Sequence, residues 1–363
     1  MQAEKVSLDT SGAEGLIAGV IGIEAGLFGS SSTYIGANLV AANNSSFWYS
    51  YDGKTWFESE DQPNDNVNGI TFGSNTWVAV GGSSNCRIWR SEDGIQWQSV
   101  DCAAGDNTKK TDVAFGNGVF VTTGGQNGAT TIISLSYDLG ETWNSLQIPG
   151  TIGELQTITF LPYQKQFYAS YGVNVEIYSG LPDNSSMVST DGVNWNYVSI
   201  DNDALDVIVK AGPSGSVLLS GLFDNGIDAY YNYSIGTFSG NDFSWAQPSQ
   251  RIELTDVDKP KFAYGAGRYV SVGDDGYSMC KFYYYNSGWQ QLTTGSLPVS
   301  CNGSSVWRSL TYSTAINLFV AGGNNYDVPR TTFAYSSNGI TWNEADTSNL
   351  ITSSTPNIIV ARQ

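Results

Sequence analysis

A carboxylate two residues after a serine recurs along this chain, and such a pair could do chemistry. The longest copy reads SYDLGETW at residues 136–143. An aspartate beside a hydroxyl could assist a nucleophile, whereas aspartate and glycine around a bend stabilise a turn. The 363 residues include no His, so the usual base of a hydrolytic triad and the most common metal ligand are both missing. Any catalysis would have to rely on carboxylates.

The octapeptide is one of five related copies. The other four are one residue shorter and read SYDGKTW (50–56), SEDGIQW (91–97), STDGVNW (189–195) and SSNGITW (336–342). Two further segments keep only the terminal tryptophan. The seven tryptophans follow one another at intervals of 41, 46, 52, 50, 44 and 53 residues: Trp56, Trp97, Trp143, Trp195, Trp245, Trp289 and Trp342. Intervals of this size are typical of a repeat architecture.

A second pattern precedes these copies. In NGITFGSNTWVAVGG (68–82) and TDVAFGNGVFVTTGG (111–125), an alternating apolar run reaches an aromatic residue, and a turn leads into a second alternating run. This layout predicts a β-hairpin, and the Asp-bearing motif adds two more strands. Four antiparallel strands in each of seven repeats predict an all-β, seven-bladed β-propeller of four-stranded antiparallel blades. Blades four and five are expected within residues 156–198 and 205–247.

These motifs resemble the Asp-box, or bacterial neuraminidase repeat, over about residues 30–348. Residues 136–143 match S-x-D-x-G-x-T-W at every fixed position, and the shorter copies drop the residue between Asp and Gly. The repeats place each motif at a turn, where the carboxylate accepts backbone hydrogen bonds and the tryptophan packs between sheets. The residues with this structural role are Asp52, Asp93, Asp138, Asp191 and Asn338, which replaces Asp, together with Trp56, Trp97, Trp143, Trp195 and Trp342.

The resemblance implies no single activity, because sialidases, sortilin-type receptors, some xyloglucan hydrolases and photosystem II assembly factors share it. A sialidase should carry an Arg-Ile-Pro motif, but the Arg-Ile pairs at Arg87 and Arg251 lack the proline. Photosystem II assembly factors are expected to use a basic patch, which so acidic a chain would struggle to form. Because five blades carry the same device, we expect no enzyme activity, no cofactor and no metal.

The charge balance limits the partners. Sixteen basic and 34 acidic residues give a net charge of −18, which disfavours nucleic acid and anionic membrane surfaces. Acidic loops at residues 61–66, 201–206 and 273–276 raise the question of calcium, but none has the twelve-residue ligand order of a calcium loop. We expect these loops to be solvated turns.

The four cysteines predict two disulfides. Cys86 and Cys102 are equidistant from Gly94 at the centre of a predicted hairpin, so they face each other across its strands. Cys280 and Cys301 flank the equivalent segment of blade six, although their midpoint lies a few residues late. Zinc is disfavoured because the spacings are long and His is absent. Disulfides place the chain in an oxidising location: extracellular, on a cell surface or on a virion.

Five sequons are compatible with a glycoprotein: Asn43, Asn44, Asn184, Asn232 and Asn302. The apolar stretch GLIAGVIGIEAGLFG (15–29) lacks a preceding basic region, so it does not resemble a signal peptide, and it is too short to span a bilayer. Residues 1–29 are expected either to complete the ring or to dock on a neighbouring subunit. Residues 349–363, which include PNIIVAR, are expected to help close the ring.

The sequence therefore favours a non-catalytic propeller that acts in adhesion, structure or assembly, and that self-associates through its N-terminal segment. The expected partners are a protein or a glycan, with a homo-oligomer or filament as one form of assembly. A carbohydrate-binding, lectin-like propeller and a His-free glycoside hydrolase are the alternatives. Trp48 and Tyr326 are candidates for ligand contact, whereas Phe72, Phe115 and Tyr264 are expected in the core between blades.

Overall fold

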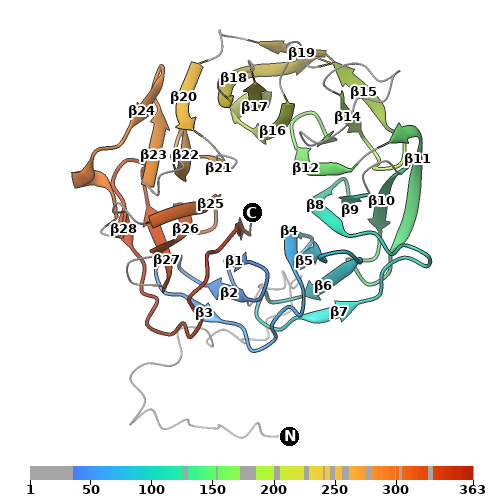
Figure 1. Ribbon diagram of the computed structural model, residues 1–363, viewed down its shortest axis with the longest axis horizontal. Helices are drawn as coiled ribbons and strands as arrows, with labels where there is room; N and C mark the ends of the chain where they lie inside the picture. Colours follow the sequence, from blue (N-terminus) through green and yellow to red (C-terminus); the bar gives the residue numbers. More distant parts are fainter. Residues whose placement is uncertain are drawn as a thin grey trace, which may run out of the picture. The chain divides into compact units, whose positions relative to one another are not determined.

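The chain folds into a ring of seven antiparallel sheets around a central axis (Figure 1). The computed structural model describes residues 36–125, 130–152, 154–171, 185–199, 205–224, 229–239, 242–245, 250–255, 261–274, 280–298, 300–301, 305–325 and 330–362. The all-β, seven-bladed propeller predicted from the repeats is confirmed. Residues 1–29 lie outside the described residues, so the predictions for that segment stay predictions.

Each blade runs from an inner strand at the axis to an outer strand at the rim (Figure 1). Blade one contains β1 (Leu39–Ala42), β2 (Phe47–Ser50) and β3 (Phe57–Glu58). Blade two contains β4 (Val67–Gly73), β5 (Thr76–Gly81), β6 (Arg87–Ser91) and β7 (Gln98–Val100). Blade three contains β8 (Lys110–Gly116), β9 (Val119–Gly124), β10 (Thr130–Ser136) and β11 (Asn144–Ile152). Blade four contains β12 (Leu155–Leu161), β13 (Gln166–Tyr171), β14 (Ser185–Ser189) and β15 (Asn196–Ser199).

The remaining blades follow the same order. Blade five contains β16 (Leu205–Ala211), β17 (Ser216–Asp224), β18 (Ala229–Ser239) and β19 (Asp242–Trp245), and β20 (Gln250–Thr255) adds a fifth strand by pairing with β18. Blade six contains β21 (Lys261–Gly265), β22 (Arg268–Asp274), β23 (Cys280–Tyr285) and β24 (Trp289–Gln291). Blade seven contains β25 (Ser305–Ser313), β26 (Leu318–Asn325), β27 (Arg330–Ser336) and β28 (Asn343–Glu344). Two short 3-10 helices are η1 (Pro213–Gly215) and η2 (Thr294–Ser296).

The C-terminal strand β29 (Ile358–Ala361) closes the ring. It takes the innermost place in blade one and pairs antiparallel with β1, so that Leu39 faces Ala361 and Ala42 faces Ile358. The segment that leads to β29 crosses the outer part of blade one, where the Glu58 carboxylate accepts the backbone N–H of Ile351 at 3.0 Å. Blade one therefore combines strands from both ends of the described chain.

A β-bulge interrupts the inner strand of five blades near its start. The bulges lie between Val67 and Gly69, Lys110 and Asp112, Leu155 and Thr157, Leu205 and Ile208, and Trp307 and Ser309. A bulge re-aims the side chain of the extra residue. Two of these side chains reach the next blade: Asn68 donates to the carbonyl of Lys110 at 2.7 Å, and Thr111 donates to the carbonyl of Leu155. The bulges thus tie neighbouring inner strands together.

Aromatic residues at the ends of the inner strands pack on glycines of the preceding blade. A Cβ atom at each such glycine would lie 2.1 Å from a ring atom of the next blade, in the pairs Gly73 with Phe115, Gly116 with Phe160, and Gly265 with Tyr312. No side chain fits at that distance, so only glycine leaves room for the aromatic ring of the neighbouring blade. This explains why β4, β8 and β21 end in an aromatic residue followed by glycine, and it places Phe115 between blades as expected.

Candidate functional site

In the repeated turns, the polar side chains form hydrogen bonds with the backbone of the same turn. In blade three the Asp138 carboxylate accepts the backbone N–H and the hydroxyl of Thr142 at 2.9 and 2.5 Å, and the Ser136 hydroxyl accepts the N–H of Gly140 at 2.8 Å. Asp52, Asp93, Asp191 and Asn338 accept the equivalent backbone N–H groups at 2.8–2.9 Å. Because Asn338 forms the same bonds as the four aspartates, the turn requires a side-chain oxygen but not a negative charge.

The hydrogen bonds of the turn also set the acidity of its carboxylate. Partial burial would raise the pKa of Asp138, but the bonds donated by Thr142 and Ser136 outweigh it and lower the pKa to about 2. Gly140 adopts a φ of 83°, in the left-handed region that favours glycine, and a Cβ there would lie 2.9 Å from Val78 of the preceding blade. The turn is thus a structural contact between blades, and Asp138 is not poised to transfer protons at neutral pH.

The tryptophans of the repeats pack against the preceding blade. Trp56 stacks on Phe333 at 3.8 Å between ring centroids, Trp97 stacks on Phe47 at 4.3 Å, and Trp342 contacts Phe282 edge-on at 4.8 Å. Trp143 and Trp195 belong to the hydrophobic clusters formed with blades two and three, respectively. These rings therefore bury the surface between sheets and are not available to a ligand.

Both predicted disulfides are present. Cys86 and Cys102 flank β6 and β7 at opposite positions of the hairpin register, with their Cα atoms 6.3 Å apart, and Cys280 and Cys301 join at 5.4 Å. The second pair is less symmetric because Cys301 comes from the loop that contains η2, after β24 has ended. No cysteine is free.

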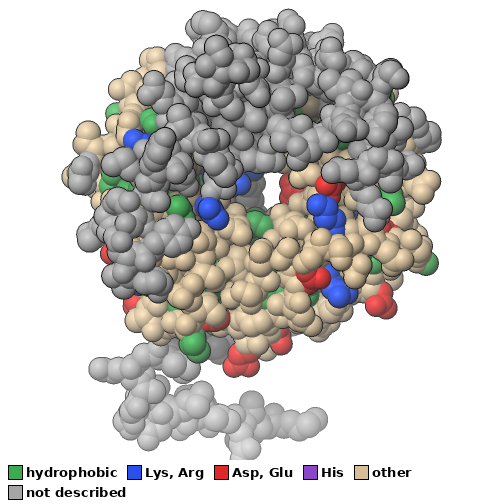
Figure 2. Space-filling model, viewed as in Figure 1, with side chains coloured by type: hydrophobic (Ala, Val, Ile, Leu, Met, Phe, Trp, Pro, Cys, Tyr) green, Lys and Arg blue, Asp and Glu red, His purple; other side chains and the backbone are tan. Residues whose placement is uncertain are grey.

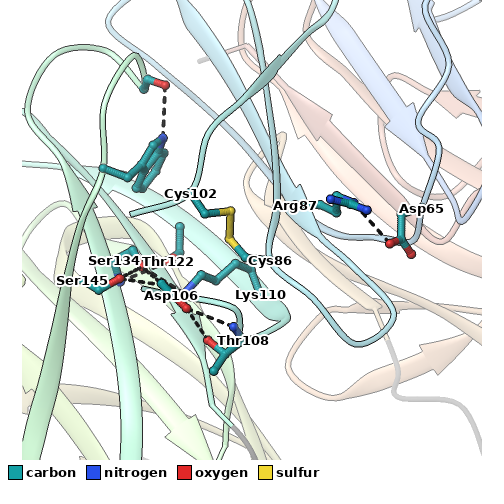
Figure 3. The surroundings of a disulfide bond; sticks show 12 residues. Asp65, Cys86, Arg87, Cys102, Asp106, Thr108, Lys110, Thr122, Ser134 and Ser145 are labelled. Atoms are coloured by element: carbon teal, nitrogen blue, oxygen red, sulfur yellow. Dashed lines mark hydrogen bonds and ion pairs between the residues drawn. A yellow bond between two sulfur atoms is a disulfide. The ribbon is translucent and has the colours of Figure 1, made fainter. Parts of the chain in front are cut away.

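The first disulfide adjoins a buried ion pair (Figure 3). Lys110 Nζ lies 2.5 Å from Asp106 Oδ2, and the same carboxylate oxygen accepts hydrogen bonds from Ser134 at 2.8 Å and Ser145 at 2.7 Å. Burial alone would raise the pKa of Asp106, but Lys110 and these hydroxyls hold it well below its ordinary value. The loop that follows Cys102 is thus anchored to three strands of blade three, β8, β10 and β11. Local spacing does not connect these residues, so the network could not be predicted from the sequence.

Carboxylates of the acidic loop 61–66 form hydrogen bonds within the protein. Asp61 accepts the backbone N–H of Trp97 at 3.0 Å, and Asp65 accepts the hydroxyl and N–H of Ser83. Loops 201–206 and 273–276 lie partly outside the described residues. Within the described part of the chain, no group of three or more His, Cys, Asp or Glu side chains could hold a metal ion.

Two predictions for exposed residues need correction. Trp48 is fully buried in β2 and donates to the hydroxyl of Thr352 at 3.2 Å, so it is wrong as a ligand contact. Asn43 is 5% exposed; its side-chain amide donates to the carbonyl of Thr355 and accepts the backbone N–H of Ser46. A glycan therefore has no access to Asn43, whereas the adjacent Asn44 is exposed. Tyr326, Asn184 and Asn302 lie outside the described residues. Asn232 lies in β18, where it is paired with β17 and β20.

The remaining concave site is the channel along the ring axis (Figure 2). Inner strands of all seven blades line a cavity of about 320 Å³. Lys210 of blade five, Lys261 of blade six and Asp112 of blade three contribute charge to it, among polar side chains that include Asn68, Thr111, Gln156, Thr157, Ser309 and Asn357. We call the part of the channel that Asp112, Lys210 and Lys261 line the channel waist.

Asp112 is fixed in place by the backbone around it. Its two carboxylate oxygens accept the N–H groups of Val113 at 2.8 Å and Ile158 at 3.0 Å. A Cβ at Gly69 would lie 2.7 Å from Asp112 Oδ1, so the preceding blade also closes against it. Burial raises the pKa of Asp112 to about 6, although the two hydrogen bonds and the nearby Lys210 and Lys261 act in the opposite direction.

Lys210 faces the channel with an exposed side chain. Enclosure by the ring lowers the pKa of Lys210, and the charge of Asp112 counters that effect. No hydrogen bond or ion pair closer than 4 Å joins Lys210 to any other residue that the structure describes. Since the side chain is in contact with solvent, we expect the ammonium group to be charged at neutral pH.

Beyond the waist the channel becomes aromatic. A second cavity of about 360 Å³ shares Asp112 and Lys210 with the first. Five half-buried rings at the ends of inner strands line this part, which we call the aromatic end: Phe72, Phe115, Phe160, Tyr264 and Tyr312. Phe72, Phe115 and Tyr264 were expected in the core, and they combine packing between blades with a surface that faces the channel.

Comparison with known proteins supports the architecture. No family model and no curated protein matches the chain. A solved structure described as YCF48 bound to D1 peptide is 15% identical with a TM-score of 0.52, over 79% of this chain and 84% of that one. Hydrazine synthase of Kuenenia stuttgartiensis is 9% identical with a TM-score of 0.54, over 86% of this chain and 100% of that one. At these identities the likeness shows a shared fold alone. No described helix has the length and apolar character needed to cross a bilayer.

Proposed function

We propose that this chain is a non-catalytic propeller that acts by binding a protein partner, and that a segment of the partner enters the aromatic end of the channel. The observation that carries the proposal is the contrast between the repeated turns and the channel. The turn carboxylates already accept hydrogen bonds from the backbone of the turn, whereas the rings at the aromatic end expose part of their surface to a cavity. Partly exposed aromatic residues that line a cavity are characteristic of binding sites.

The channel has the wrong composition for hydrolysis by carboxylates. A glycoside hydrolase needs two carboxyl groups on either side of the bond that it cleaves. Asp112 is the single carboxylate among the described residues that line the two cavities, and both of its oxygens accept backbone N–H groups. The solved structure of the same fold that is described as YCF48 bound to D1 peptide is a precedent for peptide binding by such a protein.

We further propose that the protein works outside the cell or on the surface of a cell or virion, as a structural or adhesive module. Two disulfides support this location, because such bonds persist in oxidising surroundings. Self-association through residues 1–29 is part of the proposal. Electron micrographs of the purified full chain test this self-association. Filaments or closed assemblies that revert to single rings after deletion of residues 1–29 would support it. Single rings of the full chain would contradict it.

A carbohydrate ligand is the second candidate, and an aromatic cluster at the rim of blade one favours it. Tyr49, Tyr51 and Phe57 lie within 5.4–6.4 Å of one another, and Tyr51 is 47% exposed. Exposed rings of this kind can stack on sugars. Retention of the protein on a glycan array, and its loss in Tyr51→Ala, would favour this function.

The protein-binding proposal can be tested with a displayed library of random peptides. We expect selected peptides to bind the native chain and to lose about tenfold or more in affinity when Tyr264 and Tyr312 are replaced by Leu, which keeps apolar bulk but removes the rings. Tyr137→Leu is the matched control, because Tyr137 is 62% exposed on an outer turn. Equal affinity of the double variant and the control would contradict binding at the aromatic end.

A further inference from the structure

Equivalent tyrosines of blades one and seven have different neighbours. Tyr49 in β2 and Tyr335 in β27 each directly precede the serine that begins the repeated turn. Lys54, from the turn of the next blade around the ring, places its Nζ atom 5.6 Å from the centre of the Tyr335 ring, which is within the range of a cation–π interaction. Blade two has Ile95 at the position of Lys54. Within the described part of the chain, no Lys or Arg side chain lies over the Tyr49 ring.

Tyr49 belongs instead to a group of three rings with Tyr51 and Phe57, which we call the rim cluster. Tyr49 and Phe57 face each other across β2 and β3, and their rings are stacked with centroids 5.4 Å apart. The Tyr51 ring meets them at steep angles of 83° and 62°. Tyr51 is 47% exposed, so the cluster is open to solvent on this side. The face of an aromatic ring attracts cations, and rings at steep angles present faces in different directions.

Carboxylates lie beside the rim cluster. Burial raises the pKa of Tyr49, and the neighbouring Tyr51, Asp93 and Glu60 raise it further. Burial and the charge of Asp93 also raise the pKa of Tyr51. The turn of blade two holds Asp93 in place, because its Oδ1 atom accepts the backbone N–H of Ile95 at 2.8 Å. A cation at the rim cluster would therefore meet both ring faces and a fixed negative charge.

These carboxylates distinguish two classes of ligand. A neutral sugar gains from stacking on the rings, but it gains nothing from the charges of Asp93 and Glu60. An organic cation gains from both, and the net charge of −18 on the whole chain attracts it over longer distances. The contact of Lys54 with Tyr335 shows that a ring at this position of the repeat can accept an ammonium group. The rim cluster therefore favours a cationic ligand.

We propose that the rim cluster binds the trimethylammonium group of a choline-type ligand. Its rings contact the methyl groups, and Asp93 and Glu60 attract the positive charge. Such a group cannot donate hydrogen bonds, so aromatic faces take the place of the acceptors that a lysine would need. Free choline and phosphocholine share this chemistry. The inference concerns a second site, at the rim, and it does not depend on a peptide at the aromatic end of the channel.

The test uses the full chain in calorimetry and ligand-observed NMR. Choline represents the free cation, and phosphocholine represents a headgroup. The neutral match is the carbon analogue of choline, in which a tert-butyl group replaces the trimethylammonium group, and methyl glucoside represents a neutral sugar. We expect choline, phosphocholine or both to bind with a Kd below about 10 mM, and the two neutral probes to bind at least about tenfold more weakly. The trimethylammonium probe that binds more tightly identifies the source of the ligand.

Substitutions locate the binding. Tyr51→Leu should weaken the binding of this probe about threefold or more, because it removes a ring. Tyr137→Leu is the matched control and should leave binding unchanged, since Tyr137 has the same position in the turn of blade three and is 62% exposed. Asp93→Asn should keep the turn, as Asn338 does in blade seven, and should weaken binding about threefold because it removes a negative charge.

Thermal unfolding of each variant verifies that it is folded. The inference is overturned if neither trimethylammonium probe binds, if the neutral analogue binds as tightly, or if folded Tyr51→Leu and Asp93→Asn bind as the native chain does. Retention on a glycan array without binding of either trimethylammonium probe would overturn it in favour of the carbohydrate candidate. Peptide affinity at the aromatic end is measured separately, with the Tyr264 and Tyr312 variants, so either proposal can fail alone.

Discussion

Lys110 and Asp106 form an ion pair from which water is almost wholly excluded, with side chains that are 0% and 1% exposed. Removal of one member leaves the other charge buried without its partner. Asp106→Ala should therefore lower the free energy of unfolding by about 3–5 kcal/mol at pH 7. Chemical denaturation measures the loss.

The control for this substitution lies on the same loop. Asp101 is exposed, and Asp101→Ala should change stability by no more than about 0.5 kcal/mol. Because the pKa of Asp106 is depressed in the folded chain, its contribution is present above the unfolded value of about 3.9 and is lost only in stronger acid. Equal stabilities of the two variants would contradict the role of the ion pair.

The Cys86–Cys102 disulfide should stabilise the chain by restricting its unfolded state. A loop of 16 residues corresponds to about 3 kcal/mol. Denaturation of the Cys86→Ser/Cys102→Ser variant should show this loss relative to the native chain. Dithiothreitol should then change the stability of the variant only by reducing Cys280–Cys301. An unchanged denaturation midpoint in the double variant would show that the Cys86–Cys102 disulfide does not contribute to stability.

Asp138 offers a direct test of what the repeated turn requires. Asp138→Asn keeps an oxygen for the Thr142 N–H, as Asn338 does in blade seven, and should cost less than about 1 kcal/mol. Asp138→Ala removes the acceptor of the Thr142 N–H, the Thr142 hydroxyl and the Ser136 hydroxyl together, and should cost about 1–3 kcal/mol. Neither change should alter binding in the channel. A large loss in both variants would mean that the charge of Asp138 matters.

The stability of the folded chain should fall as the pH rises from about 4 to about 6. Burial raises the pKa of Asp112 to about 6 in the folded chain, although two backbone hydrogen bonds and the nearby Lys210 and Lys261 act in the opposite direction. Between the unfolded value of about 3.9 and this pKa, the folded chain holds a proton that the unfolded chain releases. Chemical denaturation at pH 4 and at pH 6.5 measures the change.

Asp112→Asn supplies the control for the pH dependence. The variant has no carboxyl group at this position, so its stability should depend less on pH over this range than that of the native chain. A pH profile that persists in Asp112→Asn would assign it to another group.

Most of the fold follows from the periodicity of the sequence. The repeated turns mark one end of five blades, and alternation within the hairpins sets strand pairing. The Cys86–Cys102 pair follows from symmetry about Gly94, since Ile88 faces Val100 in the same register. Cys301 breaks that symmetry because its loop contains η2, which adds residues after the outer strand.

The channel waist could not be recognised in the same way. Lys210 and Lys261 are 51 residues apart and belong to different blades, so local spacing does not connect them. A signal was present: Asp112 and Lys261 occupy a position that other inner strands fill with Gly69 or Ser309, four residues before the end of the strand. Charged residues at a position that is otherwise small or polar mark the lining of the channel.

The position of β29 governs when the ring can close during synthesis. Its partner β1 emerges from the ribosome early, but Leu39 must wait for Ala361, which follows 322 residues later (361 − 39). Until then blade one lacks its innermost strand, and β1 presents an unpaired edge with which another nascent chain could pair. The cost of closing so long a loop grows only slowly with its length, so the delay is mainly one of time. Synthesis of β29 thus ends the period in which blade one can misassemble.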